Sequence, residues 1–250
     1  MKWAAPVAIV AAVVGGWELL ARLGSVQDYL LPAPSEVARA LVDDRALLLP
    51  DAWVTAREVL LGFGLAIAAG LAIAIALHLS PVLRSAFYPL VIASQAVPVV
   101  VIAPILVIWF GFGIAPKLIV IALICFFPVV VNTLDGLRSV DPDQTKMLQT
   151  LDASRWDVFR RLELPHALPY LFSGAKVAVA VSVIGAVFGE LVGSDAGLGH
   201  AIQIGTAELL TARVFAAVLI LSVMAIALFG LVAAAERLAV PWAASERRPT

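Results

Sequence analysis

Long apolar runs are the feature that most constrains how this chain can fold. A helix that crosses the hydrocarbon core of a bilayer needs about 17 to 25 mainly apolar residues. Six segments have at least this length and the same apolar character: residues 4–23, 53–79, 86–110, 115–136, 167–192 and 213–236. The sequence therefore predicts an all-α polytopic membrane protein, with about six transmembrane helices and a single domain over residues 1–250.

Composition supports a membrane protein. Of the 250 residues, 62% are hydrophobic and 14% are charged, whereas soluble domains are roughly 45 to 50% apolar. The formal net charge of −1 gives no bulk electrostatic argument for nucleic-acid binding. The single cysteine, Cys125, lies in an apolar run and can support neither a disulfide framework nor a cysteine metal cluster. Met1-Lys2 and the apolar run after it fit a signal peptide, but we interpret this segment as the first membrane span.

Residues 25–52 interrupt the apolar pattern before the second predicted span. The run Leu31-Pro32-Ala33-Pro34-Ser35-Glu36 predicts a turn followed by a short amphipathic helix that Ser35 caps. We expect this segment to lie outside the bilayer.

The longest polar interval covers residues 141–169. Asp141 can cap a helix that begins at Pro142, and Ser154 with Asp157 repeats the arrangement. Two short helices should therefore meet at an elbow near residues 151–153. The second helix is half apolar and strongly basic, and we expect it to end before Pro165. Such a helix can lie in the membrane interface or dock into a partner.

The spacing within this interval resembles the coupling-helix signature of the permease subunits of ATP-binding-cassette importers. That signature has Glu-Ala-Ala, then a glycine, then a closing apolar-x-Leu-Pro. This chain has Lys146-Met147-Leu148, then Asp152, then Leu162-Glu163-Leu164-Pro165 at the same spacing. The first three residues and Asp152 depart from the family pattern, and the effect of these departures is open.

The flanking segments 126–128, 132–142 and 167–170 resemble one branch of this family. The branch imports nitrate, taurine and other sulfonates, and its close relatives take up pyrimidine precursors of thiamine or riboflavin. The resemblance covers residues 31–242. It implies a substrate that is a nitrate- or sulfonate-type anion or a pyrimidine or vitamin precursor.

The resemblance also implies an assembly in a prokaryotic inner membrane. Two permease subunits, as a homodimer or a heterodimer, would pair around a central pathway, and an extracytoplasmic binding protein would deliver the solute. Two cytoplasmic ATPase subunits would bind ATP and Mg²⁺, so this chain would be a transport subunit and not an enzyme. The residues expected to contact the ATPase are Met147, Leu148, Leu151, Asp152, Ala153, Ser154, Arg155, Trp156 and Pro165.

Prolines divide the third span. Pro89, Pro98 and Pro104 each remove a backbone donor, and Ser94 and Gln95 lie between the first two. Broken helix at membrane depth is tolerated mainly where protein or a water-filled cavity satisfies the freed groups. We therefore predict that Ser94, Gln95 and Pro98 line the translocation pathway, with a kinked packing helix as the alternative.

The fifth span contains two ionisable residues. Lys176 lies close enough to Pro165 for its stem to extend to the membrane surface, although its role is open. Glu190 precedes the glycine-rich run of residues 193–199, and the family commonly has this Glu followed by Gly-Leu-Gly. An acidic group at this depth should face a cavity or a partner. We predict a pathway or gate role for Glu190, with a structural bond to the following turn as the alternative.

Small residues recur at every fourth position of the second span, as Gly62-Ala66-Gly70-Ala74. This pattern is typical of close helix packing, either inside the subunit or at a subunit interface. Gly111-Phe112-Gly113 predicts a tight turn on the outer side after the third span.

Lysines and arginines suggest the orientation. With the N-terminus inside, ten lie in inner segments: Lys2, Arg84, Arg138, Lys146, Arg155, Arg160, Arg161, Arg237, Arg247 and Arg248. Six lie in outer segments: Arg22, Arg39, Arg45, Arg57, Lys117 and Arg213. The positive-inside rule therefore favours cytoplasmic termini and a cytoplasmic elbow.

Cofactor motifs are absent from the sequence. It has no Gly-x-x-x-x-Gly-Lys-Ser/Thr loop for phosphate, and its three histidines are too far apart for a His-x-x-x-His metal site. Two other functions remain as alternatives. A self-sufficient secondary transporter should show inverted repeats with matching interrupted helices. A membrane-embedded enzyme should show polar groups converging at one depth.

Overall fold

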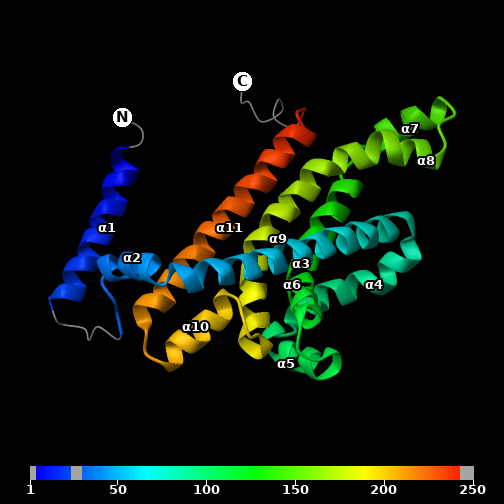
Figure 1. Ribbon diagram of the computed structural model, residues 1–250. Helices are drawn as coiled ribbons and strands as arrows, with labels where there is room; N and C mark the ends of the chain where they lie inside the picture. The colour runs from blue at the N-terminus through cyan, green and yellow to red at the C-terminus, as the bar shows by residue number, and fades with distance from the viewer. Residues whose placement is uncertain (1–3, 24–29, 243–250) are drawn as a thin grey trace.

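The computed structural model describes residues 4–23 and 30–242, and all regular structure in these two ranges is helical (Figure 1). The predicted all-α class is confirmed. The helices are α1 (Ala4–Arg22), α2 (Pro34–Asp43), α3 (Arg45–Leu79), α4 (Pro81–Ala93), α5 (Val99–Phe110), α6 (Ile114–Arg138), α7 (Pro142–Thr150), α8 (Arg155–Val158), α9 (Leu164–Gly193), α10 (Leu198–Ala207) and α11 (Thr211–Ala239). A 3₁₀ turn, Ser94–Ala96, follows α4, and a π-helical turn, Phe159–Glu163, joins α8 to α9.

Four helical segments among the described residues are long and apolar enough to cross a membrane. They are α3, α6, the continuous segment Arg155–Gly193, and α11. A fifth candidate is the broken pair Pro81–Ala96 and Val99–Phe110, whose halves are bent by 101°. Helix α1 has 19 residues and coincides with the first predicted span. The count of six spans stays a prediction.

The segment before the second span differs from the prediction in two ways. The cap of α2 is Ala33 and not Ser35, because Pro34 takes the first helical position and the helix starts two residues earlier than predicted. The Ala33 N–H donates to the Glu36 carboxylate at 3.0 Å, while the Ser35 hydroxyl donates to Glu18 of α1 at 2.8 Å. In addition, α3 begins at Arg45 instead of residue 53, so residues 45–52 of that segment extend the helix of the second span.

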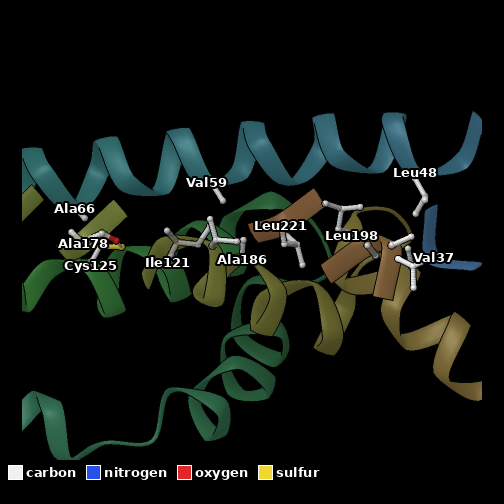
Figure 2. Close-up of a cluster of buried hydrophobic side chains, with 14 of the residues drawn as sticks. Val37, Leu48, Val59, Ala66, Ile121, Cys125, Ala178, Ala186, Leu198 and Leu221 are labelled. Carbon is white, nitrogen blue, oxygen red and sulfur yellow. Dashed lines mark hydrogen bonds between the residues drawn. The ribbon is translucent and has the colours of Figure 1, made fainter. Parts of the chain in front are cut away.

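Helix α3 packs lengthwise against α6 and α9. Figure 2 shows Leu48, Val59 and Ala66 on one face of α3, directed at the buried side chains of the neighbouring helices. A Cβ atom on Gly62 would lie 2.6 Å from Ile121 Cβ, and one on Gly70 would lie 2.7 Å from Val129 Cγ1. The small-residue pattern of the second span therefore allows close packing of α3 on α6 inside the subunit.

Two ion pairs tie α11 to the rest of the bundle. Arg213 donates two hydrogen bonds of 2.9 Å to Asp44, which lies between α2 and α3. Lys176 of α9 donates to Glu236 of α11 at 2.8 Å. The ammonium group of Lys176 thus has a carboxylate partner on the neighbouring helix, and the interpretation that its stem extends to the membrane surface stays a prediction.

Figure 1 shows which parts of the molecule share a side. The start of α1, the end of α11 and the α7–α8 elbow lie toward one side, which we call the elbow side. Helices α5 and α10 lie toward the opposite side. The elbow extends away from the other helices where α9 begins.

Candidate functional site

Both caps predicted for the elbow are present. The Asp141 carboxylate accepts from the N–H of Asp143 at 2.8 Å, and Pro142 begins α7. The Ser154 hydroxyl accepts from the N–H of Asp157 at 3.1 Å, while the Asp157 carboxylate accepts from the N–H of Ser154 at 3.3 Å. These reciprocal bonds satisfy backbone donors that a helix start leaves free, so they fix where α8 begins.

The turn between α7 and α8 depends on one residue with a left-handed backbone. Asp152 has a φ of +64°, and its N–H donates to the carbonyl of Gln149 at 3.1 Å. The N–H of Ala153 donates to the carbonyl of Leu148 at 3.1 Å and closes the turn. Aspartate is among the residues that adopt this conformation with least strain. Asp152 thus makes the turn in which the family signature has glycine.

The second elbow helix does not end before Pro165, contrary to the prediction. Helix α8 passes through the π-helical turn directly into α9, and the N–H of Leu164 donates to the carbonyl of Phe159, five residues earlier. A proline inside an α-helix has no N–H and crowds the carbonyl four residues before it. The wider π turn accommodates Pro165, so the helix continues through it.

Large apolar side chains are exposed on the elbow. Met147, Leu151 and Trp156 are 62%, 70% and 61% exposed, respectively. The Trp156 ring stacks on the buried Phe159 ring with centroids 5.4 Å apart, which holds Trp156 in place. The remaining predicted contact residues line the same elbow: Leu148, Ala153 and Pro165 are half-buried, and Asp152, Ser154 and Arg155 are exposed. Clustered exposed apolar side chains with a polar rim are typical of a protein-binding surface.

The predicted break in the third span is present. The chain turns by 101° between α4 and α5, and Pro98 is the N-cap of α5. Ser94 and Gln95 line an open hollow of about 300 Å³, together with side chains of α5 and α6. The Ser94 hydroxyl donates to the carbonyl of Val91 at 2.7 Å, which satisfies an acceptor that the break leaves free. The pathway role of Ser94, Gln95 and Pro98 stays a prediction.

Glu190 bonds to α3 and to the start of α10. Its side chain is completely buried. It accepts a hydrogen bond of 2.6 Å from the Thr55 hydroxyl and one of 2.5 Å from the N–H of Gly199. These bonds agree with the alternative, a structural bond to the following turn, and the pathway or gate role of Glu190 stays a prediction.

Two glycines make room for the Glu190 carboxylate. A Cβ atom on Gly197 would overlap the carboxylate, and one on Gly199 would lie 2.8 Å from its Oε2 atom. Gly197 also has a φ of +112°, which side chains rarely tolerate. The Gly-Leu-Gly run after Glu190 is thus explained by the space that the carboxylate needs.

A neighbouring charged cluster was not predicted. Lys117 of α6 donates to Glu58 of α3 at 2.7 Å and to the Ser194 hydroxyl at 2.6 Å. Lys117 and Glu58 are 7% and 3% exposed. Glu58 lies inside the apolar run 53–79, and an acidic residue in such a run is the signal that could have revealed the pair.

These features define a class of protein. A bundle of long apolar helices with buried ion pairs, one sharply broken span and a capped elbow with exposed apolar side chains describes a polytopic membrane protein. Comparison with known proteins specifies the family. Residues 66–239 match the family of binding-protein-dependent transport system inner membrane components, and the chain belongs to this family.

Individual relatives agree with this assignment. The chain is 38% identical to a probable ABC transporter permease protein of Haemophilus influenzae, over 90% of this chain and 91% of the relative. It is 35% identical to the formylaminopyrimidine transport permease protein ThiX of Halalkalibacterium halodurans, over 90% of each chain. Riboflavin and taurine transport permeases are also among its relatives. The predicted branch of the family is confirmed.

A solved structure supports the fold. The inward-facing MetNI methionine ABC transporter contains a chain that aligns with a TM-score of 0.61 and 18% identity, covering 76% of this chain and 96% of that one. Together with the family match, this likeness establishes a permease subunit of an ABC importer, a multi-pass inner-membrane protein with a transport function.

Proposed function

We propose that this chain couples ATP hydrolysis on a separate subunit to solute import, and that the α7–α8 elbow is the ATPase docking site. The exposure of Met147, Leu151 and Trp156 on a rigid, capped elbow is the observation that carries this proposal. Burial of side chains of this size contributes about 1.5 to 3 kcal/mol each. A partner with a matching apolar groove would therefore bind the elbow firmly.

In the proposed assembly, two copies of this chain enclose the pathway, and each elbow binds one ATPase subunit. ATP and Mg²⁺ bind to the ATPases, and this chain needs no cofactor. Closure of the ATPases moves the elbows and shifts the bundle between two packings, one open to each side. A binding protein delivers the solute, and Ser94, Gln95 and Pro98 line its path.

We also propose that the elbow side is cytoplasmic. The excess of lysine and arginine in segments assigned to the inside supports this orientation. It also places the start of α1 and the end of α11 on the cytoplasmic side, because both lie toward the elbow side (Figure 1).

For the substrate, we propose a pyrimidine or related vitamin precursor. The identity of 35% to a formylaminopyrimidine permease over most of both chains supports this class. Purification of the cognate binding protein and mass spectrometry of the ligand that it retains test the proposal. A sulfonate or nitrate in that protein would contradict it.

Substitution at Ala153 tests the docking site. Ala153 lies in the turn and is half-buried, so Ala153→Trp adds bulk where the elbow would enter a groove, without altering an apolar span. Hot-spot positions of interfaces contribute about 2 kcal/mol or more. We therefore expect at least a tenfold loss of affinity for the ATPase, and a corresponding fall in hydrolysis stimulated by the binding protein.

The measurements are the amount of ATPase subunit retained on affinity-purified permease and the stimulated hydrolysis in reconstituted vesicles. Ala153→Ser is the matched control, because it keeps the turn small, and it should behave as wild type. Full ATPase retention and stimulation with Ala153→Trp would show that the elbow is not the docking site.

A further inference from the structure

A polar contact connects the elbow segment to the end of α3. The His78 Nε2 atom lies 2.8 Å from the Glu163 Oε2 atom, and the two side chains are only 13% and 19% exposed. His78 is in the last turn of α3, and Glu163 ends the π-helical turn that leads from α8 into α9. The contact therefore joins two segments that are 85 residues apart in the chain.

An aromatic contact runs parallel to this polar one. The His78 ring lies against the Phe159 ring with centroids 6.3 Å apart, and Phe159 stacks in turn on Trp156. Trp156 is 61% exposed on the elbow surface, whereas Phe159 is 4% exposed. A continuous series of ring contacts thus leads from the proposed docking surface to α3.

The surrounding contacts are apolar. Phe159 is buried with Leu137 of α6 and Ala167 of α9, and Ile75 of α3 packs against this cluster. Apolar burial is non-directional, so such a cluster does not by itself fix the orientation of one side chain relative to another. A short charge-assisted hydrogen bond fixes both a distance and an orientation. The His78–Glu163 contact is therefore suited to make α3 follow the elbow.

The π-helical turn sets the position of Glu163 relative to the docking surface. One extra residue in a helical turn rotates everything after it by about 100°, because an α-helix has 3.6 residues per turn. Without that residue, the angle between Trp156 and Glu163 around the helix axis would be the one that an uninterrupted α-helix gives. Such turns occur frequently at functional sites.

The far end of α3 is fixed to the opposite side of the bundle. Thr55 and Glu58 of α3 bond to Glu190 and Lys117, and Asp51 accepts from the N–H of Gly197 at 2.9 Å. Helix α3 has 35 residues, which corresponds to a length of about 52 Å at 1.5 Å per residue. A displacement at His78 can therefore reach the turn that follows α9 on the opposite side.

We propose that His78 and Glu163 are positioning residues for coupling: their contact transmits movement of the elbow to α3, and through α3 to the opposite side of the permease. The proposal rests on the proposed docking of the ATPase at the elbow. It assigns the pair no chemical step and no contact with the solute.

A double-mutant cycle in reconstituted vesicles tests this link. His78→Ala and Glu163→Ala should each retain the ATPase subunit but transport at least about fivefold less solute per ATP hydrolysed, a coupling of about 1 kcal/mol. The double variant should be no worse than either single one, because all three lack the same contact. Glu163→Gln keeps the side-chain volume and should show an intermediate loss of transport per ATP hydrolysed. This variant can still be measured if the alanine variants do not fold.

The Lys176–Glu236 pair provides the matched control. Its length is also 2.8 Å and its side chains are 17% and 13% exposed, but it joins α9 to α11 away from the elbow. Lys176→Ala should lower thermal stability and leave transport per ATP at the wild-type value. Wild-type transport per ATP in both His78→Ala and Glu163→Ala, or an equal loss in Lys176→Ala, would overturn the proposal.

The same preparations separate this proposal from the docking proposal. If Ala153→Trp still binds the ATPase, the elbow is not the docking site. The proposed role of the His78–Glu163 contact then fails as well, because it assumes docking at the elbow. If Ala153→Trp loses the ATPase while the His78 and Glu163 variants transport normally, docking stands and the link alone is wrong.

Discussion

Glu190→Ala is the substitution whose effect the structure defines most sharply. Glu190 is completely buried, and its two oxygens accept from the Thr55 hydroxyl and the Gly199 N–H. Alanine leaves the Gly199 N–H without an acceptor, whereas the Thr55 hydroxyl keeps the Asp51 carbonyl at 3.1 Å. A buried unpaired donor costs about 1 to 3 kcal/mol. Removal of the carboxylate also removes the cost of its burial, which offsets part of this loss. We expect a net destabilisation of about 1 to 2 kcal/mol.

This destabilisation is large enough to measure on the purified permease. For chains of this size, 1 kcal/mol shifts the melting temperature by about 2 to 4 °C, so Glu190→Ala should lower it by about 2 to 8 °C. The assay heats the detergent-solubilised protein and follows the monodisperse fraction by size-exclusion chromatography. Glu190→Gln keeps one acceptor oxygen and should lose about half as much stability.

Asp195→Ala is the control, because Asp195 is an exposed acid in the same turn. Exposed substitutions usually change stability by no more than about 0.5 kcal/mol. A wild-type melting temperature for Glu190→Ala, together with reduced transport, would refute the structural role. It would instead restore the pathway role that the sequence alone suggested.

Two further predictions concern the elbow and the broken span. Asp152→Gly should leave stimulated ATP hydrolysis close to wild type. Glycine adopts a φ of +64° freely, and the exposed charge interaction that is lost contributes only about 0 to 1 kcal/mol. A fall in hydrolysis as large as that of Ala153→Trp would contradict this expectation. Cysteines placed at Ser94 and Gln95 in a Cys125-free background should react with a membrane-impermeant thiol reagent in at least one state of the transport cycle, and complete protection in every state would exclude them from the pathway.

Local signals made the elbow and the broken span predictable. The caps at Asp141 and Ser154 involve residues at most three positions away, and the turn at Asp152 depends on one backbone conformation. The break near Pro98 follows from a missing backbone donor. Each of these features is determined within a few consecutive residues, so the sequence contains the whole interaction.

The start of α3 and the passage of α8 into α9 needed the tertiary structure. Residues 45–52 are helical because α3 packs there against other elements, and Leu48 is 1% exposed. Pro165 is a strong stop signal in an isolated helix, but Phe159 is buried against α6 and α9 and holds the π-helical turn in place. Packing of distant segments outweighs the local preference at both positions.

The partners of the buried charges were likewise beyond the sequence. Glu190 bonds to Thr55, 135 residues earlier in the chain, and Lys176 bonds to Glu236, 60 residues later. The sequence by itself determined that ionisable groups lie within apolar spans and need partners there. Which partner each one finds is decided by which helix faces meet, and that follows from the packing of α3, α6, α9 and α11 as a whole.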